Sequence, residues 1–204
     1  VLLAAGLAAS CSYLPQFAPG ALAPGVTVTE TREAIVLVPT TVAPGTAGFM
    51  FYPGGLVDPH GYLQLLAEGA ASGIPVVVAK AHGNLAVFSP DAGLALRALV
   101  PAADGWVVGG HSLGGAMAAW SAHDNPDAWK GVIFLAAYPP DSKSLAAWPH
   151  PVLSLSAEHD GLSTPAKIAA TLPLLPAQQQ VLPALGTPYT STSGGYAVLH
   201  EIPG

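Results

Sequence analysis

The sequence predicts an α/β fold, with a mostly parallel sheet and helices on both of its faces. From residue 26 onward, short apolar runs of strand length alternate with segments whose apolar residues follow a helical period. Several of the strand-length runs are apolar throughout, as is expected of parallel strands that helices cover on both faces. This order of strands and helices is typical of a doubly wound sheet.

The first half of the pattern predicts strands and one helix. Strands are expected where apolar and polar residues alternate, where β-branched residues gather, or where a run is apolar throughout; these segments are Val26–Thr31, Ala34–Val38, Ala47–Tyr52 and Ile74–Ala79. Between the last two, apolar residues at helical spacing predict a helix over Tyr62–Ala71. The third strand ends abruptly at Pro53-Gly54-Gly55.

The second half continues the alternation. A helix is expected over Asp91–Leu99, where Asp91 in the first turn complements the helix dipole. Trp106–Val108 predicts a strand that runs into Gly109-Gly110, and the Ala-rich segment Ala116–His123 predicts the next helix. Two further apolar runs predict buried strands, Gly131–Ala137 and Val152–Ser156.

The composition restricts the function. Of 204 residues, 51% are apolar and 9% are charged, which excludes intrinsic disorder. A net charge of −6 with six lysines and arginines argues against binding of nucleic acid through its phosphates. The single cysteine excludes an intramolecular disulfide and a Cys-rich zinc site. We expect one domain without a metal or organic cofactor, and the oligomeric state stays open.

The first residues are typical of a secretory signal. Val1–Ala9 is an apolar run too short to span a bilayer, and Ser10 and Cys11 follow it. This end resembles the lipobox of bacterial lipoproteins, in which the cysteine is acylated; the alternative is an ordinary cleaved signal with an incidental cysteine. We expect a signal over residues 1–11, a Pro/Ala/Gly-rich tether over 12–25 and the folded domain over 26–204. The natural chain is expected to start before Val1, and the protein to work outside the cytoplasm, secreted or anchored through Cys11.

One serine is the centre of the predicted chemistry. Gly110-His111-Ser112-Leu113-Gly114 fits the pattern G-x-S-x-G. The pattern follows a predicted strand and opens a predicted helix, which is the context that a nucleophile elbow requires. A sharp turn there lifts Ser112 above the edge of the sheet, and glycines avoid clashes with the neighbouring strand and helix. The alternative is a glycine-rich turn with an idle serine.

Four blocks of the sequence together resemble the α/β-hydrolase superfamily: Phe51–Gly55, Val108–Ala118, Leu135–Pro139 and Asp160–Pro165. The resemblance extends over roughly residues 46–176 and is strongest to the small lid-less group called alpha/beta hydrolase family 5, which is related to dienelactone hydrolases. It implies an α/β-hydrolase fold, hydrolysis of esters or similar acyl bonds, Ser112 as nucleophile and Asp160 as the acidic member of a triad. Glu158 and Asp141 are the alternatives to Asp160.

The same fold implies an oxyanion hole made of backbone N–H groups. One comes from the residue after the nucleophile, here Leu113, and the other from the loop after the third strand, here Gly55 or Leu56. Pro53 has no N–H to offer.

The histidine of the triad is the point at which the sequence departs from the family. His200 is the only histidine beyond Asp160. The family presents its histidine in a Gly-Gly-Asn-His-Ala loop, whereas this chain reads Gly194-Gly195-Tyr196-Ala197, and residues 177–204 are divergent. Three explanations stay open: His200 acts as the base, the base has been lost, or the sequence is truncated or frame-shifted here. We expect an apparently truncated C-terminus without the family's final strand and helix.

Further side chains are candidates for the walls of the site. His60, His82 and Tyr138 are expected to line it, whereas His111 is expected to pack beneath the turn. The connection from Tyr138 to Val152 is too short for a cap domain, so an open site for small, soluble esters is expected. The sequence therefore predicts a serine hydrolase that acts through an acyl-enzyme on Ser112, with catalytic residues Ser112, Asp160 and His200. The alternative is a non-catalytic lipoprotein of the same fold that binds a ligand or a partner.

Overall fold

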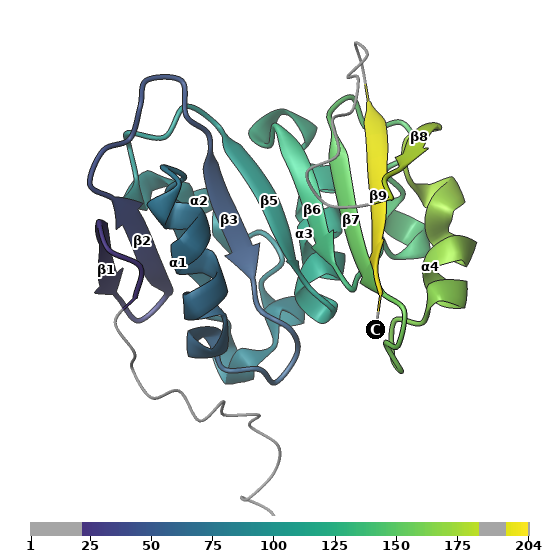
Figure 1. Ribbon diagram of the computed structural model, residues 1–204, viewed down its shortest axis with the longest axis horizontal. Helices are drawn as coiled ribbons and strands as arrows, with labels where there is room; N and C mark the ends of the chain where they lie inside the picture. The colour runs from purple at the N-terminus through teal and green to yellow at the C-terminus, as the bar shows by residue number, and fades with distance from the viewer. Residues whose placement is uncertain (1–21, 184–194, 204) are drawn as a thin grey trace, which may run out of the picture.

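The computed structural model describes residues 22–183 and 195–203. They form a single nine-stranded sheet in the order β1-β2-β4-β3-β5-β6-β7-β9-β8 (Figure 1). The strands are β1 Val26–Glu30, β2 Ala34–Pro39, β3 Gly48–Tyr52, β4 Val76–Ala79, β5 Trp106–His111, β6 Gly131–Leu135, β7 Val152–Ala157, β8 Gln178–Val181 and β9 Tyr196–Ile202. The predicted signal and the lipid attachment at Cys11 lie outside the described residues.

The structure confirms the prediction of a mostly parallel sheet with helices on both of its faces. β2 is antiparallel to both β1 and β4, and the other strand pairs are parallel. The helices are α1 Leu63–Ala71, α2 Ala92–Leu96, α3 Leu113–Asp124 and α4 Pro165–Thr171. In Figure 1, α1 lies in front of the sheet and α2 and α3 lie behind it.

Each layer has its own apolar core, because successive side chains of a strand point to opposite faces. On the α1 face, Phe51 and Val78 pack with Leu66 of the helix. On the α3 face, Val108 and Phe134 pack with α3 and with further residues, among them Met50, Met117 and Trp129. Burial of both faces of β3 and β5 holds the end of β5 firmly under α3.

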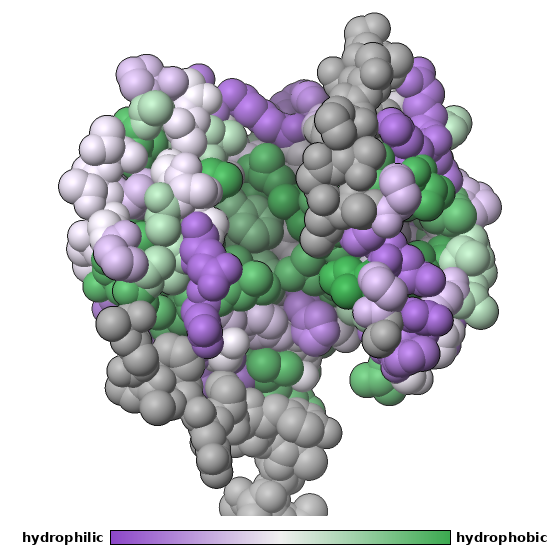
Figure 2. Space-filling model, viewed as in Figure 1, coloured by the Kyte–Doolittle hydropathy of each residue, from purple (hydrophilic) through white to green (hydrophobic). Residues whose placement is uncertain are grey.

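Figure 2 shows an apolar hollow beside α1 on its face of the sheet. The hollow encloses about 410 Å³, and its walls include Gly48, Leu65, Ile74 and Val107. These residues lie toward the amino ends of the strands. The hollow is therefore separate from the carboxyl edge of the sheet, where the predicted site lies.

The C-terminal segment differs from the expectation. We expected no final strand, yet β9 runs parallel to β7 over residues 196–202 and pairs with β8 on its other side. Ala197 and Val198 point to opposite faces of the sheet and are both buried. Apolar residues on both faces are what an inner strand needs, so this segment completes the sheet although it lacks the family's motif.

The connection between β6 and β7 is short, as expected. It contains one 3-10 turn, Asp141–Lys143, and no cap domain. In the described part of the chain, no helix has the length and apolar character needed to cross a membrane.

Candidate active site

Ser112 lies at a strained turn between β5 and α3. Its φ of 51° and ψ of −120° place a non-glycine residue in the left-handed half of backbone space, which costs free energy unless the surroundings enforce it. Two backbone hydrogen bonds hold the turn: Ser112 N–H donates to Leu135 O (3.0 Å), and Ala116 N–H donates to Ser112 O (3.2 Å). The predicted strand–turn–helix geometry is present, and α3 begins at Leu113 rather than at Ala116.

Glycines make room for this turn, as the motif predicts. A Cβ at Gly110 would lie 2.5 Å from Tyr52 O, and a Cβ at Gly114 would overlap the same carbonyl oxygen. At Gly115 a Cβ would overlap Ala137. The first turn of α3 therefore packs directly on the end of β3, and this contact brings the loop after β3 beside Ser112.

The N-terminus of α3 and the loop after β3 supply the backbone donors. The first N–H groups of a helix have no acceptor within the helix, so Leu113 N–H is available. Gly55 lies beside it, since a Cβ on Gly55 would be 3.0 Å from Leu113 Cδ2. The helix dipole adds partial positive charge at this end of α3.

The N–H groups on either side of Gly55 are already engaged. Gly54 N–H donates to the hydroxyl of Tyr62 (3.0 Å), and Leu56 N–H donates to Asn84 O (2.8 Å). The N–H of Gly55 has no acceptor among the described residues. The sequence left Gly55 and Leu56 as alternatives for the second oxyanion donor. This geometry favours Gly55, because the N–H of Leu56 already donates to Asn84 O.

His111 and Tyr62 form a hydrogen bond beneath the turn. Tyr62 Oη lies 2.9 Å from His111 Nδ1, and the rings are 5.9 Å apart between centroids. Burial lowers the pKa of His111, although the charge of Asp160 acts in the opposite direction. The sequence predicts His111 beneath the turn, but it does not predict the contact with Tyr62, because the helical pattern around Tyr62 shows nothing of a residue 49 positions away.

Asp160 lies in the loop after β7. Its Oδ1 accepts hydrogen bonds from Leu162 N–H (2.7 Å) and Ser163 N–H (2.8 Å), which fix the carboxylate. Because β5, β6 and β7 are parallel, Asp160 after β7 lies at the same carboxyl edge of the sheet as the serine turn after β5. The two alternatives lie at the same edge of the sheet: Glu158 directly follows β7, and Asp141 is in the turn after β6.

His200 lies within β9 and not in a loop. It is opposite Leu155 of β7, and the register continues through Leu135 to His111. His200 is thus level with His111 but three strands away, about 14 Å at the usual strand spacing. Its imidazole is buried, with Nδ1 3.0 Å from Leu182 O. The structure does not bring His200 to Ser112.

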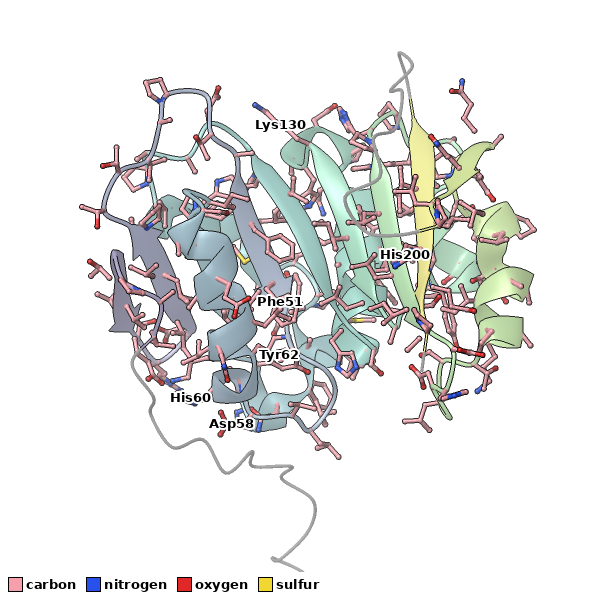
Figure 3. All side chains as sticks on the ribbon, in the orientation of Figure 1. Phe51, Asp58, His60, Tyr62, Lys130 and His200 are labelled. Atoms are coloured by element: carbon pink, nitrogen blue, oxygen red, sulfur yellow. The ribbon has the colours of Figure 1, made fainter. Side chains whose placement is uncertain are left out.

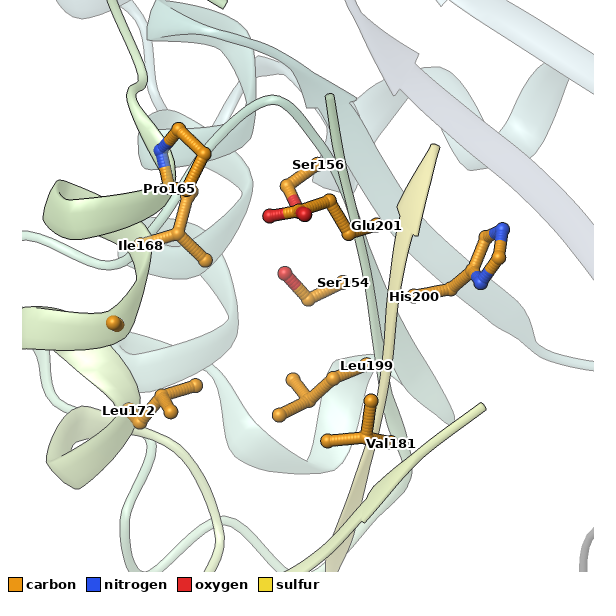
Figure 4. A pocket seen from close by; sticks show the side chains of 10 residues that line it. Ser154, Ser156, Pro165, Ile168, Leu172, Val181, Leu199, His200 and Glu201 are labelled. Carbon is orange, nitrogen blue, oxygen red and sulfur yellow. The ribbon is translucent and has the colours of Figure 1, made fainter. Parts of the chain in front are cut away.

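Figure 4 shows the direction of the imidazole. A small cavity of about 160 Å³ lies between α4 and the sheet, and Ser154, Ser156 and Glu201 point toward it. The imidazole of His200 projects from the opposite side of β9.

The expected wall residues are spread along the carboxyl edge. His60 is at the surface after β3 (Figure 3), with Nδ1 2.6 Å from Asp58 Oδ1 and Nε2 3.0 Å from Glu30 Oε2. His82 is exposed on the turn after β4, and Tyr138 is half-buried after β6. No cluster of three or more potential metal ligands is present among the described residues.

Comparison with known proteins identifies the family and the fold of this chain. A model of the alpha/beta hydrolase family matches residues 48–197, nearly three quarters of the chain. The fold is similar to a crystal structure from Thermoplasma acidophilum described as a predicted CIB-like hydrolase, with a TM-score of 0.63, 14% identity and 88% of each chain covered. No curated protein sequence matches the chain. The expected α/β-hydrolase fold is thus confirmed.

Proposed function

Because this chain belongs to the alpha/beta hydrolase family, we propose that it is a serine hydrolase that cleaves carboxylic esters or related acyl bonds through an acyl-enzyme on Ser112. The observation that carries the proposal is the turn at Ser112, with its left-handed φ at the N-terminus of α3. A nucleophile elbow requires a serine at a strained strand-to-helix turn of this kind.

The proposed reaction starts with attack of Ser112 Oγ on the acyl carbonyl. The negative charge that develops on the carbonyl oxygen is stabilised by Leu113 N–H and Gly55 N–H. A fixed donor of this kind increases the rate by about 10²–10³. The leaving group departs from the tetrahedral intermediate, and water then attacks the acyl-enzyme to release the acid and free Ser112.

The position of His200 determines which leaving groups the proposed site can expel. Because His200 is bonded to Leu182 O, we propose that it donates no proton to the departing oxygen and that the proton of Ser112 passes to solvent. An oxyanion hole without a complete triad still gives about 10³–10⁴ over the uncatalysed reaction. We propose that activated esters, whose leaving groups are stable as anions, are the substrates that this arrangement cleaves best. Asp160 is the proposed acidic member of the site, and in this arrangement no histidine is assigned as its partner.

The carboxyl edge also suggests the charge of the substrate. Asp58, Glu158 and Asp160 all lie in its loops, and the whole chain has a net charge of −6. Exposed apolar side chains stand among them, namely Leu56, Val87, Phe88 and Leu162. An acidic edge repels anions, so uncharged small esters fit it better than carboxylate-bearing or phosphorylated ones.

A second function is favoured by one observation. The hydrogen bond of the buried His200 to Leu182 O leaves Ser112 without that residue as a general base, and the second candidate is therefore a non-catalytic member of the family that binds a ligand or a partner at the same edge. This candidate predicts no reaction of Ser112 at all.

The location outside the cytoplasm is a proposal from the sequence alone. We propose that Cys11 carries a lipid and that residues 12–25 tether the domain to a membrane. Mass spectrometry of the protein from a bacterial membrane fraction tests this, since Cys11→Ser should lose the acyl mass and the membrane association together. A lipid-free protein with the same location as the variant would contradict the proposal.

Ester hydrolysis tests the proposed reaction. We expect wild type to hydrolyse p-nitrophenyl acetate above the buffer rate and to hydrolyse ethyl acetate far more slowly, because ethoxide leaves only with a proton. Ser112→Ala should fall to the buffer rate, whereas His200→Ala should retain the wild-type rate. Equal rates for wild type and Ser112→Ala would refute the proposal. Loss of activity in His200→Ala would show instead that His200 is the base.

A further inference from the structure

We infer that Tyr62 is a positioning residue for the oxyanion hole: its hydroxyl links the loop after β3 to the serine turn and thereby holds Gly55 beside Leu113. The inference rests on the proposed function for its catalytic consequence. The hydrogen bonds on which it depends are present whether or not the protein is an enzyme.

The hydroxyl of Tyr62 has one partner on each side. Gly54 N–H donates to Tyr62 Oη (3.0 Å), and Oη lies 2.9 Å from His111 Nδ1. Gly54 is the residue before the proposed donor Gly55, and His111 is the residue before the proposed nucleophile Ser112. One oxygen atom therefore joins the two halves of the candidate site.

The directions of these bonds follow from the protonation states. Tyr62 is neutral, since burial raises the pKa of its hydroxyl, and burial likewise keeps His111 neutral by lowering its pKa. The oxygen of Tyr62 accepts from Gly54 N–H, so its own O–H is free to donate to His111 Nδ1. His111 then carries its proton on Nε2.

The ring of Tyr62 cannot easily move. It immediately precedes α1 and packs on Phe51 of β3, with ring centroids 4.8 Å apart. In Figure 3, Tyr62 lies beside Phe51 near the carboxyl end of β3. Gly54 fits closely against Tyr62 and His111, because a Cβ there would be 2.7 Å from His111 Nδ1 and 3.0 Å from Tyr62 Oη.

The consequence for Gly55 comes from the bonds on both of its sides. Tyr62 holds the N–H of Gly54, and Asn84 O holds the N–H of Leu56 at 2.8 Å. With both neighbours fixed, the peptide between them has little freedom to rotate. Loss of the Tyr62 hydroxyl frees one side, and Gly55 N–H then takes several orientations instead of one.

A purely structural role for the hydroxyl makes a different prediction. It would cost stability when removed and would change activity only as far as the protein unfolds. Tyr52 provides the matched control, because its hydroxyl also makes two hydrogen bonds: it donates to Pro90 O (2.6 Å) and accepts from Gly93 N–H (2.8 Å). These partners belong to α2 and the segment before it, which lie apart from the serine turn.

The experiment compares Tyr62→Phe and Tyr52→Phe in the full chain. For hydrolysis of p-nitrophenyl acetate, we expect Tyr62→Phe to lower kcat by about tenfold to a hundredfold with little change in KM, less than the loss of a whole oxyanion donor. Tyr52→Phe should leave kcat unchanged even where it lowers the melting temperature. Equal effects of the two substitutions on kcat would overturn the inference.

Nuclear magnetic resonance gives a second readout that needs no activity. Removal of the Tyr62 O–H should raise the pKa of His111 toward its ordinary value, because a donor to Nδ1 favours the neutral ring. The amide signals of Gly54 and Gly55 should shift, and Tyr52→Phe should move none of these. An inert wild-type protein would refute the proposed function, and the signals of Gly55 and His111 would still decide the role of Tyr62. If they do not move in Tyr62→Phe, the inference is wrong.

Discussion

The position of Ser112 at the turn requires a strained backbone at this residue. A φ of 51° at a non-glycine residue costs on the order of 1–3 kcal/mol, and it persists only where the surroundings fix it. Here the surroundings are glycines: Gly110 and Gly114 both face Tyr52 O at distances that exclude a side chain. The strain and the close packing occur together, because α3 can approach the loop after β3 only where Gly114 has no side chain.

Gly114→Ala tests this packing. A Cβ there would overlap the backbone oxygens of Tyr52 and Pro53, which cannot move without disturbing β3. We expect the free energy of unfolding to fall by about 3 kcal/mol or more, measured by urea denaturation. The matched control is Gly69→Ala in α1, where a Cβ meets nothing within 4 Å. Gly69→Ala should increase the free energy of unfolding by about 0.5–1 kcal/mol. A Gly114→Ala variant that is no less stable than Gly69→Ala would contradict the packing described here.

At the scale of elements, the loop after β3 is anchored to three parts of the fold. Tyr62 at the start of α1 holds Gly54, and Asn84 after β4 holds Leu56. A little further along, His60 joins the same segment to β1 through Asp58 and Glu30. Lys80 completes this cluster with a 2.5 Å contact to Glu30. The anchors come from three separate elements, so the donor loop is held by the surrounding fold rather than by its own local sequence.

The His60 anchor should respond to pH. The pKa of His60 is raised from 6.5, chiefly by its hydrogen bond to Glu30, so its stabilisation is full below 6.5 and is lost as pH rises through the folded value. The pKa of Glu30 is lowered from 4.5, chiefly by Lys80, so its contribution is lost only as pH falls through the lower folded value. The cluster is therefore most stabilising in mildly acidic solution.

His60→Gln measures that contribution. The difference in unfolding free energy between wild type and the variant should be larger at about pH 5.5 than at about pH 8.5. Its size should stay below about 1 kcal/mol, because the side chains of His60 and Glu30 are 40% and 43% exposed. His82→Gln, at an exposed histidine of a neighbouring turn, is the control. A difference that does not change with pH would show that the anchor contributes nothing.

At the scale of the whole molecule, the parallel strands gather the proposed groups at one edge. β3 supplies Gly55, β5 supplies Ser112 and β7 supplies Asp160, because the carboxyl ends of parallel strands lie together. The strand and helix pattern of the sequence was enough to predict this arrangement. Periodicity and glycine positions are local features of the sequence, and they were sufficient to predict the strands from β3 to β7 and the serine turn.

The remaining features depend on contacts between distant segments. The choice between Gly55 and Leu56 rests on Asn84, and the role of Tyr62 rests on His111, neither of which a local pattern shows. β9 was not predicted, because this segment was compared with the histidine loop of the family and does not match it. Pairing with β7 makes residues 196–202 a strand. The same pairing places His200 in the middle of the sheet.

Reaction with a fluorophosphonate probe tests the central claim most directly. The serine hydroxyl displaces fluoride, a leaving group that is stable as an anion, while the oxyanion hole holds the phosphonyl oxygen, and the test needs no knowledge of the substrate. We predict one probe per chain, located by mass spectrometry on the peptide that contains Ser112, with no labelling in Ser112→Ala and unchanged labelling in His200→Ala. A wild-type protein that stays unlabelled while correctly folded, or a probe bound to another serine, would contradict the account.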